Sequence, residues 1–503
     1  MEKIFNTDRR IRLGIWGLGR GLNFIQAAEM LNIDIVAGCD VNPEMRSNFA
    51  TLCPDAFLTA DETEFLSRDM DAVLVATFFP AHAEHAIRAL NAGKHVLSEV
   101  TSFFTPAEGV RLAEAVEKSG KIYNLLENYP FTRENLFLAK LWKDGFFGEF
   151  QYGEFEYLHE CRLLAYAYNI PGSHGVQPGY TAHRWRSWLD FHYYNTHSLG
   201  PAMLITGLRP EYVTAVPCGI NLPGYLQGGG MGTATPSLIR MSNGGVVRNL
   251  MGATTGDSHT GKRIWGTRAS AKSLGDGLSI RVGAAGSGPE LKVEPQWPDL
   301  GKQAEAAGHG GGDFWELYYF AREFFTGEKA QWDIWSACDV TLAGIMARRS
   351  ASAGGSPMEI PNFRNAKVRD RYRHDEEKQT HFDPEKIFPE GHDPAVTGRF
   401  STVMTELCNG IPVIRAAFDA LKLYGSLADD RSRGTAIRKV AEAIGRLPEL
   451  RKSILDAQTI IDAYPDSAPA QAMRELLELG DSRKLLDPET VSAELTHAVG
   501  TLK

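Results

Sequence analysis

The chain has 503 residues, of which 43% are hydrophobic and 23% are charged, and its formal net charge is −9. This length predicts two or three domains, and the composition is typical of a globular protein. The acidic balance gives no basic surface for nucleic acid or for anionic lipid, and no membrane span is expected. No apolar stretch precedes the first predicted strand, so a signal peptide is not expected. The six cysteines include no Cys-x-x-Cys pair, which favours a reducing cytoplasm over a disulfide framework.

Strand and helix patterns alternate in the first third of the chain. Helical patterns such as Ala81–Asn91 fill the gaps between short apolar runs, and Thr105-Pro106-Ala107-Glu108 has the form of a helix-capping box. This alternation predicts an α/β domain with a doubly wound parallel sheet over residues 1–127. The predicted strands are Leu13–Trp16, Ile33–Gly38, Ala72–Ala76, His95–Leu97 and Ile122–Leu126.

The pattern changes after the first domain. Residues 128–365 are rich in strand patterns and glycine and contain a helical stretch near their end, which predicts an α+β domain with a mostly antiparallel sheet. Residues 366–400 are charged and contain prolines, so we expect a linker or an arm that wraps around the protein. Residues 401–503 have helical periodicity throughout and are expected to form an accessory helical extension.

A glycine-rich turn follows the first predicted strand. It reads GIWGLGRG from Gly14, so Gly17, Gly19 and Gly21 let the backbone approach a pyrophosphate, although the third glycine lies one place early. Asp40 ends the second predicted strand, where a carboxylate accepts the ribose hydroxyls and repels a 2′-phosphate. The motif therefore predicts a Rossmann domain that binds NAD rather than NADP. The alternative is an ordinary tight turn followed by a solvated aspartate.

A longer motif resembles the second signature of the Gfo/Idh/MocA oxidoreductase family. Thr77 to Val96 reads TFFPAHAEHAIRALNAGKHV, and Glu99 follows in register. Those enzymes have a lysine and a proline directly after this glutamate, whereas this chain has Val100 and Thr101. Since that lysine handles the substrate hydroxyl proton in the family, its loss disfavours a plain dehydrogenase.

Further segments resemble one branch of that family, the NAD-dependent glycosidases, of which α-N-acetylgalactosaminidases (glycoside hydrolase family 109) are the best known. The resemblance covers about residues 10 to 363. The motifs that carry it are Leu125–Asn128 with Arg133-Glu134, Gly148–Phe150, Glu156–Glu160, Asn195–Pro201 and Gly308–Phe314. Two segments depart from the branch, namely the loop 163–180 and the position of a substrate-binding tyrosine, where His259 stands.

The resemblance implies a role for each of three groups of residues. The catalytic residues would be Tyr157, His197 and Glu127. The substrate-binding residues would be Arg186, His159, Asn195, His259 and His309. The cofactor-binding residues would be Gly17, Gly19, Arg20, Gly21, Asp40, Thr77, His82, Glu99 and Asn128.

Elementary chemistry supports part of this assignment. Tyr157 and His159 alternate on a predicted strand, so they face the same side. An imidazole side chain suits a proton transfer that accompanies hydride loss, and His197 provides one. The alternatives are a structural histidine and a core tyrosine. No histidine pair comes with carboxylates at ligand spacing, so no metal site is predicted.

Three functions remain open from the sequence. The first is an NAD-dependent glycosidase that oxidises its sugar transiently at C3. The second is an NAD-dependent sugar dehydrogenase, and the third is a nucleotide-binding protein without turnover. We expect a small glycoside or sugar as substrate, a homo-oligomer and a cytoplasmic location. The sugar, its anomer and its aglycone do not follow from the sequence.

Overall fold

The computed structural model describes residues 4–501 except 161, 168–181, 184–185, 187–188, 227–233, 254, 276 and 380–386. The chain forms two compact units. The first consists of residues 1–159, 190–220 and 231–380, and the second consists of residues 160–189, 221–230 and 381–503.

The first unit contains a six-stranded sheet in the order β3-β2-β1-β4-β5-β6, in which every pairing is parallel. Its strands are β1 Ile11–Trp16, β2 Ile33–Cys39, β3 Phe57–Thr59, β4 Ala72–Val75, β5 His95–Glu99 and β6 Tyr123–Leu126. The helices between them are α1 Leu18–Gly21, α2 Ile25–Met30, α3 Pro43–Leu52, α4 Glu62–Leu66, α5 His82–Asn91 and α6 Pro106–Ser119. The strand order reverses between β1 and β4, and ligands bind at such a switch point in open α/β sheets. The predicted Rossmann sheet is confirmed.

Local sequence signals set the ends of these helices. Thr105 accepts the backbone N–H of Glu108 through Oγ1 at 3.2 Å, and Glu108 accepts that of Thr105 through Oε2 at 3.1 Å. This reciprocal cap fixes the start of α6, with Pro106 at its first position. The helix ends at Gly120, whose φ of +63° is a left-handed conformation that glycine adopts without strain.

A nine-stranded sheet follows in the order β14-β13-β12-β11-β7-β10-β9-β8-β15. Among the described strands, β7 and β10 form a parallel pair and the other pairs are antiparallel, as the sequence predicts. The strands are β7 Phe150–Leu158, β8 Pro210–Ala215, β9 Ala234–Met241, β10 Val246–Gly252, β11 His259–Gly266, β12 Ser270–Ser273, β13 Leu278–Arg281, β14 Glu290–Val293 and β15 Met358–Glu359.

Helices cover one face of this larger sheet. Helix α9 packs on β7 and β10, and α12 packs on β8 and on α6 of the parallel sheet's layer. The helices of this part are α7 Arg133–Lys143, α9 Thr196–Thr206, α10 Gly301–Glu305, α11 Gly312–Thr326 and α12 Ile334–Ser352. These helices join the two sheets into one unit, and short 3-10 turns precede α7 and α9.

The charged segment after residue 365 follows the first unit as far as residue 379. It begins with α13 Ala366–Asp370. Arg369 and Arg373 pair with Glu117 and Glu114 of α6 at 2.6 and 2.5 Å. Asp375 forms a two-pronged ion pair with Arg349 of α12 at 2.6 and 2.7 Å. The described part of this segment therefore behaves as a wrapping arm and is held by ion pairs rather than by an apolar core.

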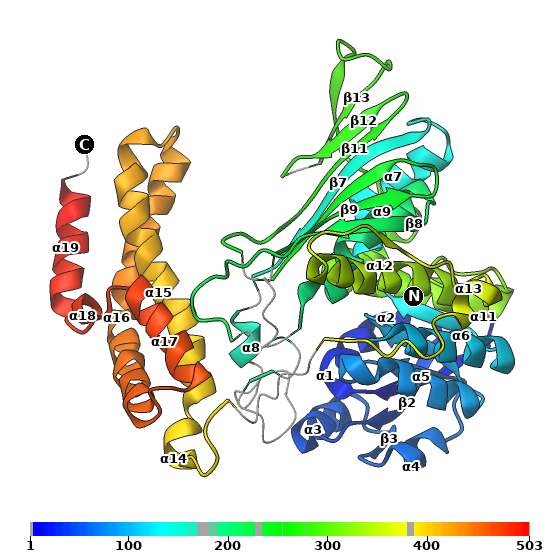
Figure 1. The fold of residues 1–503 in the computed structure, drawn as a ribbon, viewed down its shortest axis with the longest axis horizontal. Helices are drawn as coiled ribbons and strands as arrows, with labels where there is room; N and C mark the ends of the chain where they lie inside the picture. The colour runs from blue at the N-terminus through cyan, green and yellow to red at the C-terminus, as the bar shows by residue number, and fades with distance from the viewer. Residues whose placement is uncertain are drawn as a thin grey trace. The chain divides into compact units, whose positions relative to one another are not determined.

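The second unit is mostly helical, as the sequence predicts for its C-terminal part. Its helices are α8 Leu164–Ala167, α14 Pro394–Thr397, α15 Phe400–Leu423, α16 Asp430–Ala463, α17 Ala468–Leu479, α18 Ser482–Leu485 and α19 Pro488–Gly500. Helices α15 and α16 lie along each other, and α17 and α19 contact both (Figure 1). In the part of the chain that the structure describes, none of the helices has both the length and the apolar character needed to cross a membrane.

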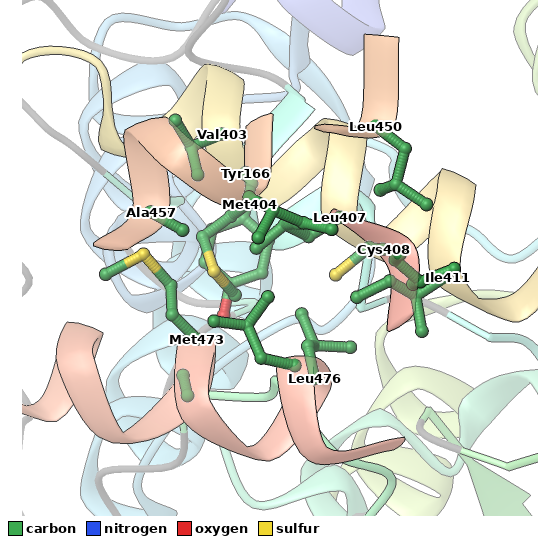
Figure 2. Close-up of a cluster of buried hydrophobic side chains, with 14 of the residues drawn as sticks. Tyr166, Val403, Met404, Leu407, Cys408, Ile411, Leu450, Ala457, Met473 and Leu476 are labelled. Carbon is green, nitrogen blue, oxygen red and sulfur yellow. The ribbon is translucent and has the colours of Figure 1, made fainter. Parts of the chain in front are cut away.

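The first testable prediction concerns the core of the second unit. Leu407 of α15 is fully buried among the helices (Figure 2), so Leu407→Ala should lower the free energy of unfolding of this unit by about 2–5 kcal/mol. Leu423 lies on the same helix with 59% of its surface exposed, so Leu423→Ala should change stability by less than about 0.5 kcal/mol. Urea unfolding followed by circular dichroism measures both. Equal effects of the two substitutions would contradict this description of the core.

Candidate active site

The glycine-rich turn between β1 and α1 packs closely against neighbouring parts of the protein. Gly17 has a φ of +95°, and a Cβ on it would lie 2.4 Å from the carbonyl oxygen of Ala76. A Cβ on Gly21 would lie 2.4 Å from Cγ2 of Ile15 on β1. Gly21 therefore allows the close helix-to-strand packing that the third glycine of the fingerprint provides, even though it comes one position early.

Asp40 closes the other side of this turn. Its Oδ2 accepts the backbone N–H of Leu18 and its Oδ1 accepts that of Asn42, each at 2.7 Å. Burial raises the pKa of Asp40, while these two N–H donors and Arg46 act against that rise. A carboxylate has about four acceptor positions, so lone pairs remain for ribose hydroxyls. The free acceptor positions of Asp40, together with the turn at Gly17, fit an NAD molecule.

His82 ties two strand ends together. It is buried, with Nδ1 3.0 Å from the carbonyl oxygen of Thr101 and Nε2 3.0 Å from that of Thr77. Burial lowers the pKa of His82, and the two carbonyls oppose that effect only in part. Thr77 Oγ1 also lies 2.7 Å from Nδ1 of His85. His82 therefore positions the loops that follow β4 and β5, one of which contains a cis peptide bond between Val100 and Thr101.

An ion-pair network joins the glycine-rich turn to α11. Arg20 donates through Nε to Glu99 at 2.8 Å and through Nη1 and Nη2 to the two oxygens of Asp313 at 2.9 and 2.7 Å. Nδ1 of His309 lies 3.1 Å from each of these oxygens, and Asn128 donates to one of them at 3.4 Å. Burial alone would raise the pKa of Asp313, but the hydrogen bonds from His309 and Arg20 hold it well below its usual range.

Glu316 lies one turn further along α11 and has a different environment. It is buried, and neither carboxylate oxygen has a hydrogen-bond partner among the described residues. Burial raises its pKa well above the usual range, and the charges of Asp313 and Glu99 act in the same direction. Its surroundings therefore favour the protonated, uncharged form of the carboxyl group. No sequence motif pointed to it.

The end of β6 holds a buried carboxylate–imidazole pair. Oε1 of Glu127 lies 2.7 Å from Nδ1 of His197, and both side chains are buried. A carboxylate at Nδ1 stabilises the tautomer that carries its proton there and leaves Nε2 as the base. Glu127 follows β6, and His197 lies in the first turn of α9, so the two sheets' layers meet at this pair.

Three tyrosine rings surround His197. The centroids of Tyr129, Tyr157 and Tyr194 lie 4.8, 4.8 and 4.7 Å from that of the imidazole. The hydroxyl of Tyr157 lies 3.0 Å from Nδ1 of His159, as expected for alternate residues of one strand that share a face. The structure thus brings the three predicted catalytic residues and His159 into one cluster.

His309 links this cluster to the ion-pair network, since its ring lies 6.5 Å from that of Tyr129 while its Nδ1 faces Asp313. Sequence reasoning missed Tyr129 and Tyr194 as members of the site. Each is adjacent to a predicted site residue, namely Asn128 and Asn195, and that adjacency was the available signal.

The remaining predicted substrate residues lie elsewhere. His259 pairs in register with Leu158, so it faces the side of the sheet opposite Tyr157, and its Nε2 contacts Glu156 at 3.1 Å. Asn195 is buried beside Gly344 of α12. Arg186 belongs to the second unit, where its carbonyl accepts the hydroxyl of Tyr225 at 2.6 Å. The structure does not bring His259 to the cluster, and the substrate-binding role of Arg186 stays a prediction.

Within the described ranges, no group of three acidic, histidine or cysteine side chains is arranged to hold a metal.

Comparisons with known proteins agree with this geometry. Residues 11–126 match the family model described as "Oxidoreductase family, NAD-binding Rossmann fold". The chain is 25% identical to proteins named "Glycosyl hydrolase family 109 protein" from Shewanella sp. strain W3-18-1 and from Shewanella pealeana, over 70% of this chain and 85% of theirs. The resemblance to the Gfo/Idh/MocA oxidoreductases and to glycoside hydrolase family 109 is confirmed, and the cofactor is NAD.

Solved structures show the same fold. A levoglucosan dehydrogenase in complex with NADH and levoglucosan superposes with a TM-score of 0.57 at 20% identity, covering 70% of this chain and all of that one. An oxidoreductase from Agrobacterium radiobacter in complex with NAD⁺, L-tartaric acid and magnesium superposes with the same score at 15% identity, again over 70% of this chain. These likenesses establish the fold.

The second prediction concerns cofactor choice. Asp40→Ala removes the carboxylate that accepts ribose hydroxyls, so the Kd for NAD should rise by about tenfold, the effect of one charged hydrogen bond, while the Kd for NADP should change less. Isothermal titration calorimetry with both dinucleotides measures this. The control Asp40→Asn keeps an acceptor for the loop N–H groups and separates loop disorder from charge. Wild-type protein that binds both dinucleotides equally would contradict the prediction.

The third prediction concerns pH and Glu316. Its folded-state pKa is raised, so above the unfolded-state value of about 4.3 the unfolded chain releases a proton that the folded chain keeps, and stability falls with rising pH until the folded-state pKa is passed. Glu316→Gln removes this loss and should raise the Tm at pH 8 more than at pH 5. Thermal unfolding at both pH values checks this, with Glu84→Gln at an exposed position of α5 as the control. A Tm gain for Glu316→Gln that is larger at pH 5 would contradict it.

Proposed function

We propose that the protein is an NAD-dependent glycosidase, with an NAD-dependent sugar dehydrogenase as the alternative. The observation that carries the proposal is the buried Glu127–His197 pair set among three tyrosines at the carboxyl edge of the parallel sheet. Buried Val100 occupies the place of the family's lysine, so the proton transfers fall to other groups. The glycoside hydrolase names of the relatives support the same activity.

The first proton transfer would involve His197. Bound NAD would supply a hydride acceptor for the sugar carbon C3 and return the hydride at the end. As hydride leaves C3, the C3 hydroxyl must lose its proton, and Nε2 of His197 is the base that its contact with Glu127 leaves available. The buried carboxylate then stabilises the imidazolium that forms, and His197 returns the proton when C3 is reduced again.

The second proton transfer would involve Tyr157. A ketone at C3 makes the proton on C2 acidic. The phenolate oxygen of Tyr157 takes that proton, the C2–H electron pair forms the C1=C2 double bond, and the bond from C1 to the aglycone oxygen breaks. His159 lies 3.0 Å from this hydroxyl and can take up its proton beforehand. Water then adds its oxygen to C1, the proton that water gives up goes to the departed aglycone oxygen, and Tyr157 returns the C2 proton, so the net reaction is hydrolysis.

The dehydrogenase alternative uses the first transfer alone. The Glu127–His197 pair is sufficient for oxidation of a sugar hydroxyl, and a solved neighbour of similar fold is named a levoglucosan dehydrogenase. The two functions differ in their stoichiometry, because a dehydrogenase releases one NADH per substrate and a glycosidase of this kind consumes no NAD.

The fourth prediction separates the two proton transfers. On the best substrate from a panel of nitrophenyl glycosides, His197→Ala should lower kcat by about 10²–10⁴-fold, the usual contribution of a general base, with NAD binding retained. Tyr157→Phe should retain hydride transfer, seen as NADH absorbance, and should lose aglycone release. The exposed histidine of α19 offers a control, and His497→Ala should change neither rate.

Deuterium incorporation at C2 in heavy water tests the assignment directly. Wild-type enzyme should exchange the C2 hydrogen, and Tyr157→Phe should not. The proposal fails if His197→Ala turns over at a near-normal rate or if Tyr157→Phe still exchanges C2. One NADH formed per substrate consumed by the wild type would select the dehydrogenase.

A further inference from the structure

The wrapping arm, residues 366–379, ends with a buried glutamine that contacts the turn before His197. Oε1 of Gln379 accepts the backbone N–H of Asp190 at 2.7 Å, and the backbone N–H of Gln379 donates to the hydroxyl of Tyr193 at 3.1 Å. All three of these residues are buried. Because a buried N–H group needs an acceptor, the bond to Gln379 fixes where the backbone of Asp190 lies.

Asp190 in turn fixes the 3-10 turn Phe191–Tyr194. Its Oδ1 accepts the backbone N–H of His192 and lies near Nδ1 of the same residue, each at 2.9 Å. Asn195 ends this turn and is also the N-cap of α9. His197 lies two residues later, in the first turn of that helix. A displacement of Asp190 therefore reaches His197 through a single turn of backbone.

The same turn also contacts the imidazole and is tightly packed against α12. The ring of Tyr194 lies 4.7 Å from that of His197. A Cβ on Gly344 of α12 would lie 2.5 Å from the carbonyl oxygen of His192 and 2.9 Å from Oδ1 of Asn195. The position of His197 thus depends on a turn that α12 and the end of the wrapping arm both restrict.

Polar contacts fix the wrapping arm just before Gln379. Asp375 forms the two-pronged ion pair with Arg349 of α12. Glu376 accepts the hydroxyl of Thr105, the N-cap of α6, at 2.9 Å. Gln379 therefore extends from a segment that is attached both to the start of α6 and to α12, and all of these residues belong to the first unit.

We infer that Gln379 is a positioning residue for His197, and that the wrapping arm thereby sets the geometry of the Glu127–His197 pair. Gln379 acts through Asp190 and the turn that follows it, and takes no part in the chemistry. The inference rests on the proposed function for the reaction that His197 serves, whereas the position of the imidazole can be measured without it. The glycine-rich turn and Asp40 lie on other loops, so we expect NAD binding to be independent of Gln379.

The test replaces Gln379 in the full-length protein. Gln379→Met keeps the length of the side chain and removes the acceptor for Asp190, whereas Gln379→Glu keeps an acceptor. Gln458→Met is the matched control, because Gln458 is exposed on α16 and donates to Asp462 of the same helix. The Kd and stoichiometry for NAD, measured by isothermal titration calorimetry, show for each variant whether the first unit is folded.

Two measurements report on His197. The nitrogen chemical shifts of its ring, measured in protein with isotope-labelled histidine and assigned by their absence in His197→Ala, depend on which nitrogen carries the proton and on the contact with Glu127. The second measurement is kcat for the nitrophenyl glycoside that the wild type turns over best, or for the free sugar if NADH accumulates instead.

We expect Gln379→Met to move the ring shifts of His197 and to lower kcat by about 10–100-fold, the effect of a slightly misplaced catalytic group, with KM and the Kd for NAD unchanged within about twofold. Gln379→Glu should retain more of kcat than Gln379→Met. Gln458→Met should have the wild-type values throughout.

The inference is overturned if Gln379→Met leaves either the ring shifts or kcat at the wild-type value, or if Gln379→Glu is as impaired as Gln379→Met. Should Gln379→Met fail to fold, Asp375→Asn tests the same link by weakening the ion pair with Arg349, and ring shifts identical to those of the wild type would then overturn it. A wild type that turns over no glycoside or sugar contradicts the proposed function, and the ring shifts then decide this inference by themselves.

Discussion

The buried ion pair between Arg20 and Asp313 is the constraint on which the candidate site depends. It joins the turn after β1 to the start of α11, and its second arm reaches Glu99 at the end of β5. Removing one partner of a buried ion pair leaves the other charge without compensation and costs about 3–5 kcal/mol. His309 and Asn128 also contact Asp313, so together with Arg20 three side chains from separate parts of the chain meet at one carboxylate. This contact fixes the glycine-rich turn relative to the start of α11.

The proposed mechanism divides the proton transfers between several groups. A lysine at position 100 would place one cation beside the substrate, whereas Glu127 contacts Nδ1 of His197 and leaves Nε2 as the acceptor that the proposal uses. Two buried carboxyl groups of α11 have pKa values shifted in opposite directions, lowered for Asp313 and raised for Glu316. The difference follows from their partners, because Asp313 accepts hydrogen bonds from Arg20 and His309 whereas Glu316 has none among the described residues.

Sequence reasoning predicted the parts of the molecule that depend on local pattern. The parallel sheet, the glycine-rich turn and Asp40 follow from spacing along the chain, and the cluster of Tyr157, His159 and His197 follows from motif order. The partners that lie far apart in the chain could not be predicted, because no local signal relates Arg20 to Asp313 or marks Glu316 as a buried carboxyl group. His259 shows the converse failure. Its place in the motif order suggested the site, but the period of two along a strand turns it to the other face of the sheet.

The three-segment construction of the second unit also constrains how the protein comes to be folded. Tyr166 packs against Phe400 and its neighbours, which leave the ribosome only after the whole first unit has been made. During synthesis at about 5–20 residues per second, residues 160–189 leave the ribosome long before the helices on which Tyr166 packs. The elements on either side of them, β7 and α9, are already able to fold at that stage. Contacts of such long sequence separation form late, because the loop must close before they stabilise anything. The chain is therefore expected to fold in two stages. In the intermediate the first unit is folded, while Tyr166 and the side chains that later pack around it are still exposed to aggregation and to proteases.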